Sequence, residues 1–227
     1  MTIRQNLDLV ESRLQSACRA AGRERSEVRL LPVSKTHPPA VLREAYQLGL
    51  RELGENRVQE LTSKATELSD LDLRWVMVGH LQRNKAGAAA QVVAELQSLD
   101  SLDLAQALDR RLQAAGRGLD VLVQVNTSAE ASKSGLAPDE VLGFAERLGQ
   151  LQALRPRGLM TIALPSPDPA PVAACFDRLV ELRRRLQDRF GGGWDELSMG
   201  MSGDLELAVE RGSTCVRVGT AIFGQRG

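Results

Sequence analysis

A regular alternation constrains the fold more than any other feature: short apolar runs typical of β-strands are each followed by a helical stretch or turn. These runs are mostly apolar and lack a clean alternation of apolar and polar residues, which is typical of parallel strands covered on both faces. Eight strand–helix units within 227 residues predict a single (β/α)8 barrel of the TIM type, in one domain over 1–227. The expected strands are 28–34, 51–54, 74–79, 92–98, 119–126, 155–163, 195–200 and 214–219.

The helical stretches agree with this architecture. Apolar residues recur at helical spacing from Ile3 to Ala21 and predict an extra helix before the first strand. Charges run throughout that helix, so no signal peptide is expected. Further helices are expected at 102–115 and 170–190. The proline-rich run 164–171 is interpreted as a stiff connector, with a lid over a site as the alternative.

Charge and composition exclude several classes of partner. The 29 basic and 29 acidic residues give a formal net charge of zero, which argues against nucleic acid or an anionic membrane as the main partner. No run approaches the apolar length of a membrane span. Cys18, Cys175 and Cys215 form no CxxC pair and suit a reducing cytosol, and at least two of them are expected to be buried small hydrophobes. We therefore expect a cytoplasmic protein.

Polar and glycine residues gather where the predicted strands end. Ligands of such barrels bind at the carboxyl ends of the strands, so a site is expected on this face. No GxGxxG follows the first strand, which argues against a dinucleotide site. The segments concerned are 34–39, 54–57, 79–85, 98–101, 126–135, 160–163, 200–204 and 219–224.

Lysine is scarce in this chain. Of the 29 basic residues only Lys35, Lys64, Lys85 and Lys133 are lysines, and an amine can form a Schiff base where a guanidinium cannot. Lys35 directly follows the first apolar strand, where partial desolvation favours the neutral, nucleophilic amine. Two alternatives remain open at this point. The first is a biased codon supply, which makes lysine rare without selecting its positions. The second is that Lys35 is a rim lysine in a surface ion pair.

The seventh and eighth strands are followed by small polar residues that suit a phosphate. These are Ser202 and Gly203 after one strand, and Gly219 and Thr220 after the other. In this fold the two loops often bind phosphate through backbone N–H groups and hydroxyls. Each motif alone is also a common helix cap, so only their pairing on neighbouring strands points to an anion.

Arg217 completes the constellation on the eighth strand. Closure of the barrel brings this strand beside the first, which carries Lys35. A phosphate loop, a cation and a Schiff-base amine therefore converge. Pyridoxal 5′-phosphate (PLP) presents a phosphate, a pyridine nitrogen and an aldehyde at matching separations. Without the other features, Arg217 is an ordinary ion-pair residue.

A series of motifs then identifies a family. The chain resembles the pyridoxal phosphate homeostasis proteins over essentially its whole length, through LLPVSKTHPP, ELGENRVQE, WVMVGHLQRNK, VNTSAEASKSGL, GLMTIA and LSMGMSGDLELAVERGSTCVRVGTAIFG. The resemblance implies a monomer with a barrel similar to that of alanine racemases and no established turnover. It implies PLP as an internal aldimine on Lys35, its phosphate on Ser202, Gly219 and Thr220, Arg217 beside the pyridine nitrogen, and Asn56 near the cofactor.

A few positions depart from the family pattern or stay undecided. His37 stands where a second lysine is frequent, and Arg57 where a tyrosine is frequent, so a role of either in moving the cofactor is in doubt. Lys85 and Lys133 are interpreted as solvated loop lysines, with a second, transient PLP contact as the alternative. None of this touches the six residues of the expected site.

The residues around the expected site also bear on whether the protein is a PLP carrier or a PLP enzyme. An arginine beside the pyridine nitrogen disfavours ring protonation, and a two-base racemase needs a second proton donor. The chain's single tyrosine, Tyr46, is expected to pack within a helix, and His80 to be a structural histidine. We expect a non-enzymatic carrier that holds PLP reversibly, limits free PLP and supplies apo-enzymes. The alternatives are a low-activity amino-acid racemase and an aldolase-like barrel using Lys35 on a sugar phosphate.

Overall fold

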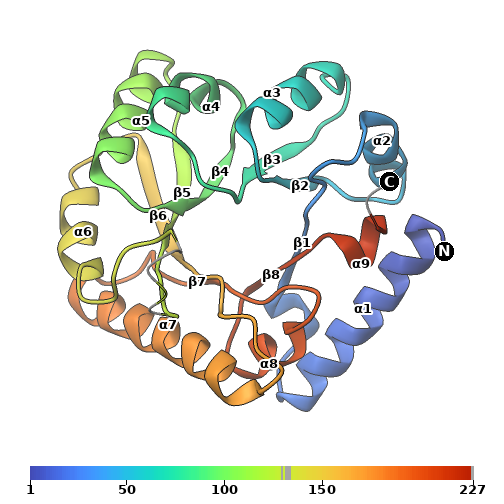
Figure 1. Ribbon diagram of the computed structural model, residues 1–227. Helices are drawn as coiled ribbons and strands as arrows, with labels where there is room; N and C mark the ends of the chain where they lie inside the picture. Colours follow the sequence, from blue (N-terminus) through green and yellow to red (C-terminus); the bar gives the residue numbers. More distant parts are fainter. Residues whose placement is uncertain (129, 131–133, 226–227) are drawn as a thin grey trace.

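The structure, a computed structural model, describes residues 1–128, 130 and 134–225. Within these residues eight parallel strands form one ring, in the order β1-β8-β7-β6-β5-β4-β3-β2 (Figure 1). A bridge between Val33 and Gly54 joins β1 to β2, so the predicted TIM-type barrel is confirmed. The strands are β1 (Arg29–Pro32), β2 (Glu52–Glu55), β3 (Arg74–Met77), β4 (Glu95–Leu99), β5 (Leu119–Gln124), β6 (Leu154–Met160), β7 (Glu196–Ser198) and β8 (Cys215–Val218).

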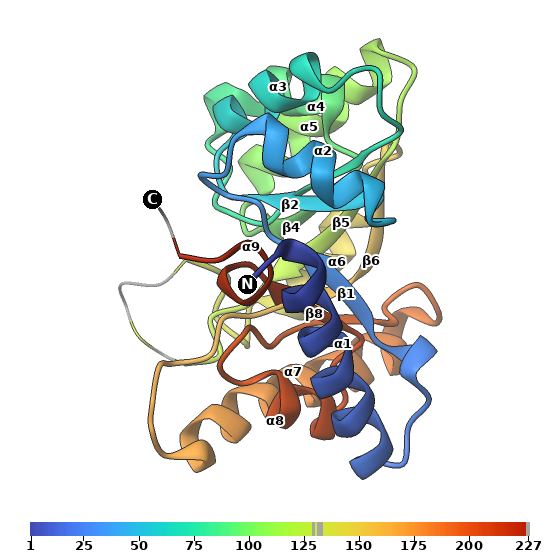
Figure 2. The same cartoon turned by 90° about the vertical axis from the view of Figure 1, so that its right-hand side faces the viewer.

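Helices surround the ring, with one more before the first strand. The N-terminal helix α1 packs along the outside of the barrel against α8 and α9 (Figures 1 and 2). It begins in a capping box between Thr2 and Gln5, and the expected extra helix is confirmed. The α-helices are α1 (Ile3–Ala20), α2 (Pro39–Gln47), α3 (Val58–Glu67), α4 (Ala86–Val92), α5 (Leu102–Ala114), α6 (Val141–Leu148), α7 (Pro169–Phe190), α8 (Leu205–Glu210) and α9 (Thr220–Phe223).

Two predicted strands have a boundary that differs from the structure by three residues, and the bounds of the other six differ by at most two. β4 begins at Glu95 instead of residue 92, because α4 continues to Val92; a short apolar run does not by itself distinguish helix from strand. β6 ends at Met160 instead of residue 163. The proline-rich run is only partly a connector. Asp168 caps α7, and its last prolines occupy the first turn of that helix, where no intrahelical N–H bond is lost.

The barrel interior carries an ion cluster at the amino ends of the strands and an apolar cluster nearer the mouth. Near the mouth the buried side chains include Leu31, Val33, Val76 and Val78. At the amino ends of the strands, Arg29 donates to Glu95 at 2.6 and 2.8 Å, and Glu95 is 2% exposed. The three cysteines are free and buried, as predicted. Among the described helices, none combines the length and apolarity that a membrane crossing requires.

Candidate functional site

A cavity of about 290 Å³ opens at the carboxyl ends of the strands. It lies on the face that the sequence predicts, and its walls come from the ends of β1, β2, β3, β6, β7 and β8. The structure brings together all six residues that the sequence assigns to a cofactor site. These residues are Lys35, Asn56, Ser202, Arg217, Gly219 and Thr220.

Lys35 enters this cavity from a chain segment that is fixed on both sides. β1 ends at Pro32, and the Ser34 N–H then donates to the carbonyl of Gly54 at 2.9 Å. Thr36, the next residue along, has φ = 68°, the single positive φ outside glycine in the described residues. Such a backbone is costly for a residue with a Cβ and persists where its surroundings hold it. The direction of Lys35 is therefore set by its immediate neighbours.

Arg217 is a buried cation at the floor of the cavity. It is 5% exposed and donates to Ser198 Oγ at 2.6 Å and to the Thr161 carbonyl at 2.8 Å. These bonds use two of its five N–H donors. No carboxylate among the described residues lies within ion-pair distance, and burial lowers the pKa of the guanidinium. A buried charge with this environment calls for an additional acceptor.

The loops after β7 and β8 form one side of the mouth. Gly219 is the N-cap of α9 and no side chain caps the helix there, so its first N–H groups are available to a ligand. A Cβ at Gly219 would lie 3.0 Å from the Val33 carbonyl oxygen, so the close approach to β1 favours glycine. Arg13 of α1 donates to the Ser202 carbonyl at 3.0 Å and holds the other loop. Hydroxyls and N–H groups on neighbouring loops suit an anion.

Asn56 reaches the cavity because the loops after β2 and β3 are in close contact. A Cβ at Gly79 would lie 2.2 Å from the Asn56 carbonyl oxygen, so any side chain at position 79 would push the two loops apart. The glycine of the GHLQRNK segment thus serves the placement of Asn56. From the sequence, Gly79 was expected only as a residue of the loop after the third strand.

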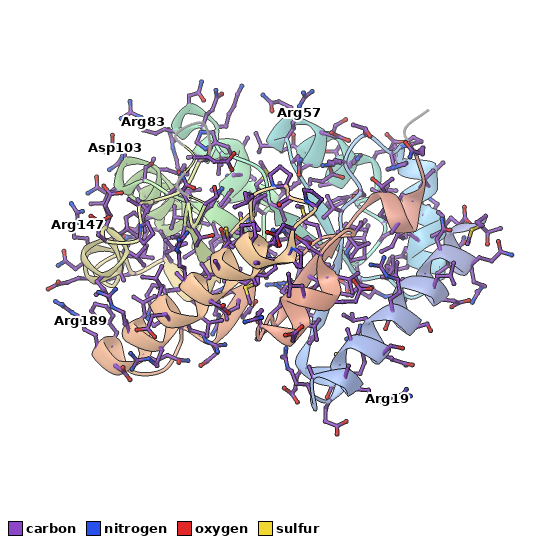
Figure 3. All side chains as sticks on the ribbon, turned by 60° about the horizontal axis from the view of Figure 1, so that its bottom comes forward. Arg19, Arg57, Arg83, Asp103, Arg147 and Arg189 are labelled. Atoms are coloured by element: carbon purple, nitrogen blue, oxygen red, sulfur yellow. The ribbon has the colours of Figure 1, made fainter. Side chains whose placement is uncertain are left out.

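Several other candidates lie elsewhere. Arg57, His80 and Lys85 line an adjoining cavity of about 480 Å³, which shares Asn56 with the first. In Figure 3 Arg57 points away from the barrel. The His37 ring lies 5.3 Å from the Phe223 ring. Tyr46 packs under Arg51, whose guanidinium carbon is 3.9 Å from the ring centroid. Lys133 lies outside the described residues.

The cavity also has apolar walls that were not predicted from the sequence, and Val33, Val78, Ile162 and Met201 provide them. Ile162 and Met201 are 40% and 39% exposed, and large apolar side chains standing in otherwise polar loops are the signal that would have found them. A buried charge cluster beneath Lys35 was missed as well. Its one trace in the sequence is the Glu60–Lys64 spacing of four residues on a helix.

Comparison with protein families, curated proteins and solved structures gives consistent relatives for this chain. The family described as "Alanine racemase, N-terminal domain" matches residues 5–227. A protein of Pseudomonas aeruginosa named pyridoxal phosphate homeostasis protein is 47% identical over 225 residues, covering 99% of this chain and 96% of that protein. The structure of PipY from Synechococcus elongatus PCC7942 with PLP bound is 39% identical, with a TM-score of 0.83 over 95% of this chain and 100% of that one.

A more distant structure shares the fold. An alanine racemase of Clostridium difficile matches with a TM-score of 0.77 at 15% identity, and the match covers 99% of this chain but 56% of the racemase. The barrel therefore corresponds to a little over half of that enzyme. The full-length match to the curated relatives settles the assignment within the family. The chain belongs to the alanine racemase N-terminal domain family and, within it, to the pyridoxal phosphate homeostasis proteins.

Proposed function

We propose that this protein binds PLP reversibly, as a Schiff base on Lys35, and keeps the concentration of the free cofactor low. The observation that carries the proposal is the meeting of three groups in one cavity. They are the Lys35 amine, a buried Arg217 without a carboxylate partner among the described residues, and the Ser202 and Thr220 loops. An aldehyde, a ring nitrogen and a phosphate require these partners. The PLP-bound relative supports the choice of cofactor.

The side chains of this cavity fit the group. Arg217 has N–H donors left over and no competing carboxylate within the described chain, which suits a neutral ring nitrogen acting as an acceptor. Ser202, Gly219 and Thr220 would hold the phosphate, and Asn56 would lie beside the ring. The apolar side chains of Val33 and Ile162 offer the flat contact that an aromatic ring needs. PLP itself would supply an aldehyde carbon that the Lys35 amine attacks.

The same cavity favours a carrier over a racemase. Apart from Lys35, its described lining contains no histidine, tyrosine or carboxylate that takes up a proton near neutral pH. His80 is not in this lining but lines two adjoining cavities, and its Nδ1 lies 3.6 Å from Asp100 Oδ2. Tyr46 faces Arg51. The described residues of this lining therefore offer no second base for a two-base racemisation. We therefore propose a non-enzymatic protein that stores PLP and supplies it to apo-enzymes, working as a cytoplasmic monomer.

A purified sample tests the proposal. Incubation with PLP is expected to give a visible Schiff-base absorption that borohydride bleaches, and the Lys35→Ala variant is expected to show neither. A protein that stays colourless with PLP, or a Lys35→Ala variant that is trapped equally well, would refute attachment at Lys35. Trapping that instead requires a sugar phosphate would favour the aldolase alternative.

Two further measurements separate storage from catalysis. Exchange of the α-proton of added amino acids at turnover rates would contradict the carrier proposal and favour a racemase. Transfer of PLP from the loaded protein to an apo-enzyme, with a trap present for free PLP, is expected if delivery is direct. Light scattering of the purified protein is expected to give the mass of one chain.

A further inference from the structure

A cluster of three charged side chains lies beneath Lys35 and outside the cavity. Lys64 of α3 is 5% exposed, Glu55 at the end of β2 is 0% exposed, and the Glu60 side chain is 23% exposed. The Lys64 ammonium donates to Glu55 Oε1 at 2.7 Å and to Glu60 Oε1 at 2.6 Å. Its third bond goes to the Ser34 carbonyl at 2.9 Å. All three of its N–H donors are used, so Lys64 is a structural cation.

This cluster holds both peptide groups that flank Lys35. Lys64 binds the carbonyl of the peptide that precedes Lys35, and Glu60 Oε1 accepts from the N–H of Thr36, in the peptide that follows it, at 2.6 Å. The Ser34 hydroxyl donates to Glu55 Oε1 at 2.6 Å. The left-handed backbone of Thr36 is thus held by a carboxylate that the Lys64 ammonium itself positions.

We infer that Lys64, with Glu55 and Glu60, is a positioning cluster that fixes the backbone of Lys35 and so aims its amine into the cavity. A lysine side chain has four rotatable bonds, and attack on a carbonyl carbon requires a narrow range of approach directions. Anchoring the two adjacent peptides removes the backbone's share of that freedom. Lys64 thereby acts on cofactor attachment without touching the cofactor.

The chemistry of the cluster fits this role better than that of a second reactive lysine. Burial raises the pKa of Glu55, while hydrogen bonds from Lys64 and Ser34 oppose that effect. Its second oxygen, Oε2, has no hydrogen-bond partner in the described part of the chain. The Lys64 ammonium, which donates its three N–H groups to two carboxylates and a carbonyl, has none left for a ligand and lies outside the cavity lining. Lys64 and Lys35 therefore have separate tasks.

The inference rests on the proposed attachment of PLP at Lys35, and two readouts keep the two apart. The first needs no PLP: amide hydrogen exchange of Thr36 in the cofactor-free protein. Glu60→Ala removes the acceptor of this N–H, and its exchange is expected to be about tenfold faster. Glu60→Gln keeps an acceptor oxygen and is expected to restore protection. An unchanged Thr36 exchange rate in Glu60→Ala would overturn the inference.

The second readout is the rate constant of borohydride-trappable Schiff-base formation with PLP. Lys64→Met and Glu60→Ala are expected to slow it about tenfold or more, with Glu60→Gln close to the wild-type rate. Arg74→Met is the matched control, because Arg74 is in a buried ion cluster at the opposite end of the barrel. Equal rates in the control, Glu60→Ala and wild-type proteins would overturn the positioning role. A wild-type protein that forms no adduct would refute the proposed function, while the exchange result would still judge the cluster.

Discussion

Arg217 is a buried charge whose stability cost is plain and whose benefit depends on a ligand. It makes hydrogen bonds to Ser198 and Thr161 but has no carboxylate partner among the described residues. Desolvating an unpaired guanidinium opposes folding, whereas a bound acceptor in the cavity would use its remaining donors. A residue with this balance is expected to matter more for binding than for stability.

Replacing Arg217 by Met tests that balance. The free energy of unfolding of the cofactor-free protein is expected to fall by less than about 2 kcal/mol, because relief of the buried charge offsets the lost hydrogen bonds. PLP affinity, measured by titration of the Schiff-base absorption, is expected to fall about tenfold or more. Arg117→Met removes comparable arginine–carbonyl bonds, to Ala90 and Val93, far from the mouth. If Arg117→Met weakens affinity as much as Arg217→Met does, the proposed role is wrong.

The residues of the site differ in how far sequence reasoning reaches them. Lys35 and Arg217 stand at strand ends, and strand order in a closed barrel brings them together, so the pattern was sufficient. Asn56 required the family resemblance, because an asparagine after a strand is common. The role of Lys64 could not be predicted from the sequence, because its burial depends on how α3 packs against the loop after β1.

At the level of whole elements, the strands are joined at their amino ends by an ion cluster. Arg29 of β1 and Arg74 of β3 both donate to Glu95 of β4, and Gln97 donates to it at 2.7 Å. Burial alone would raise the pKa of Glu95, but the hydrogen bonds and charge of Arg29, with Gln97 and Arg74, hold it below its ordinary value of 4.5. The ionised carboxylate therefore stabilises the folded state.

Glu95→Gln is expected to lower the free energy of unfolding by about 3 kcal/mol at neutral pH, because it leaves two arginines without their shared buried partner. The folded-state pKa is lowered, so this contribution is complete above about pH 4.5 and is lost as pH falls through the folded value. In urea unfolding, the difference in the free energy of unfolding between wild type and variant is expected to become smaller as the pH falls. The exposed Glu181→Gln on α7 is the control and should show a much smaller difference. If the difference for Glu95→Gln instead grows as the pH falls, Glu95 is not the ionised, stabilising carboxylate that we assign.

Elements were easier to predict than their ends. The alternation of strand and helix is repeated eight times and is therefore a strong signal, but each boundary rests on a few residues. The apolar run beginning at Val92 shows the limit. Val92 packs as the end of α4, and β4 starts at Glu95, where the carboxylate meets Arg29 across the barrel. That contact is tertiary and has no local signature.

Considered as a whole, the molecule builds its site from both ends of the chain. The first helix lies against α8 and α9 (Figure 2), and Asn6 donates to the Ile222 carbonyl at 2.9 Å. Arg13 pairs with Glu206 at 2.8 Å and also donates to the Ser202 carbonyl. A helix before the first strand thus supports the loop that we assign to the phosphate.

Arg13→Met is therefore expected to weaken the site more than the fold. The pair with Glu206 is exposed, at 39% and 49%, so the free energy of unfolding should change by less than about 1 kcal/mol. Loss of the Ser202 contact frees the loop, and PLP affinity is expected to fall by about threefold to tenfold. Arg184→Met, which breaks exposed pairs on α7, is the matched control and should leave the affinity unchanged. Equal affinities for the two variants would show that α1 supports the barrel without acting on its mouth.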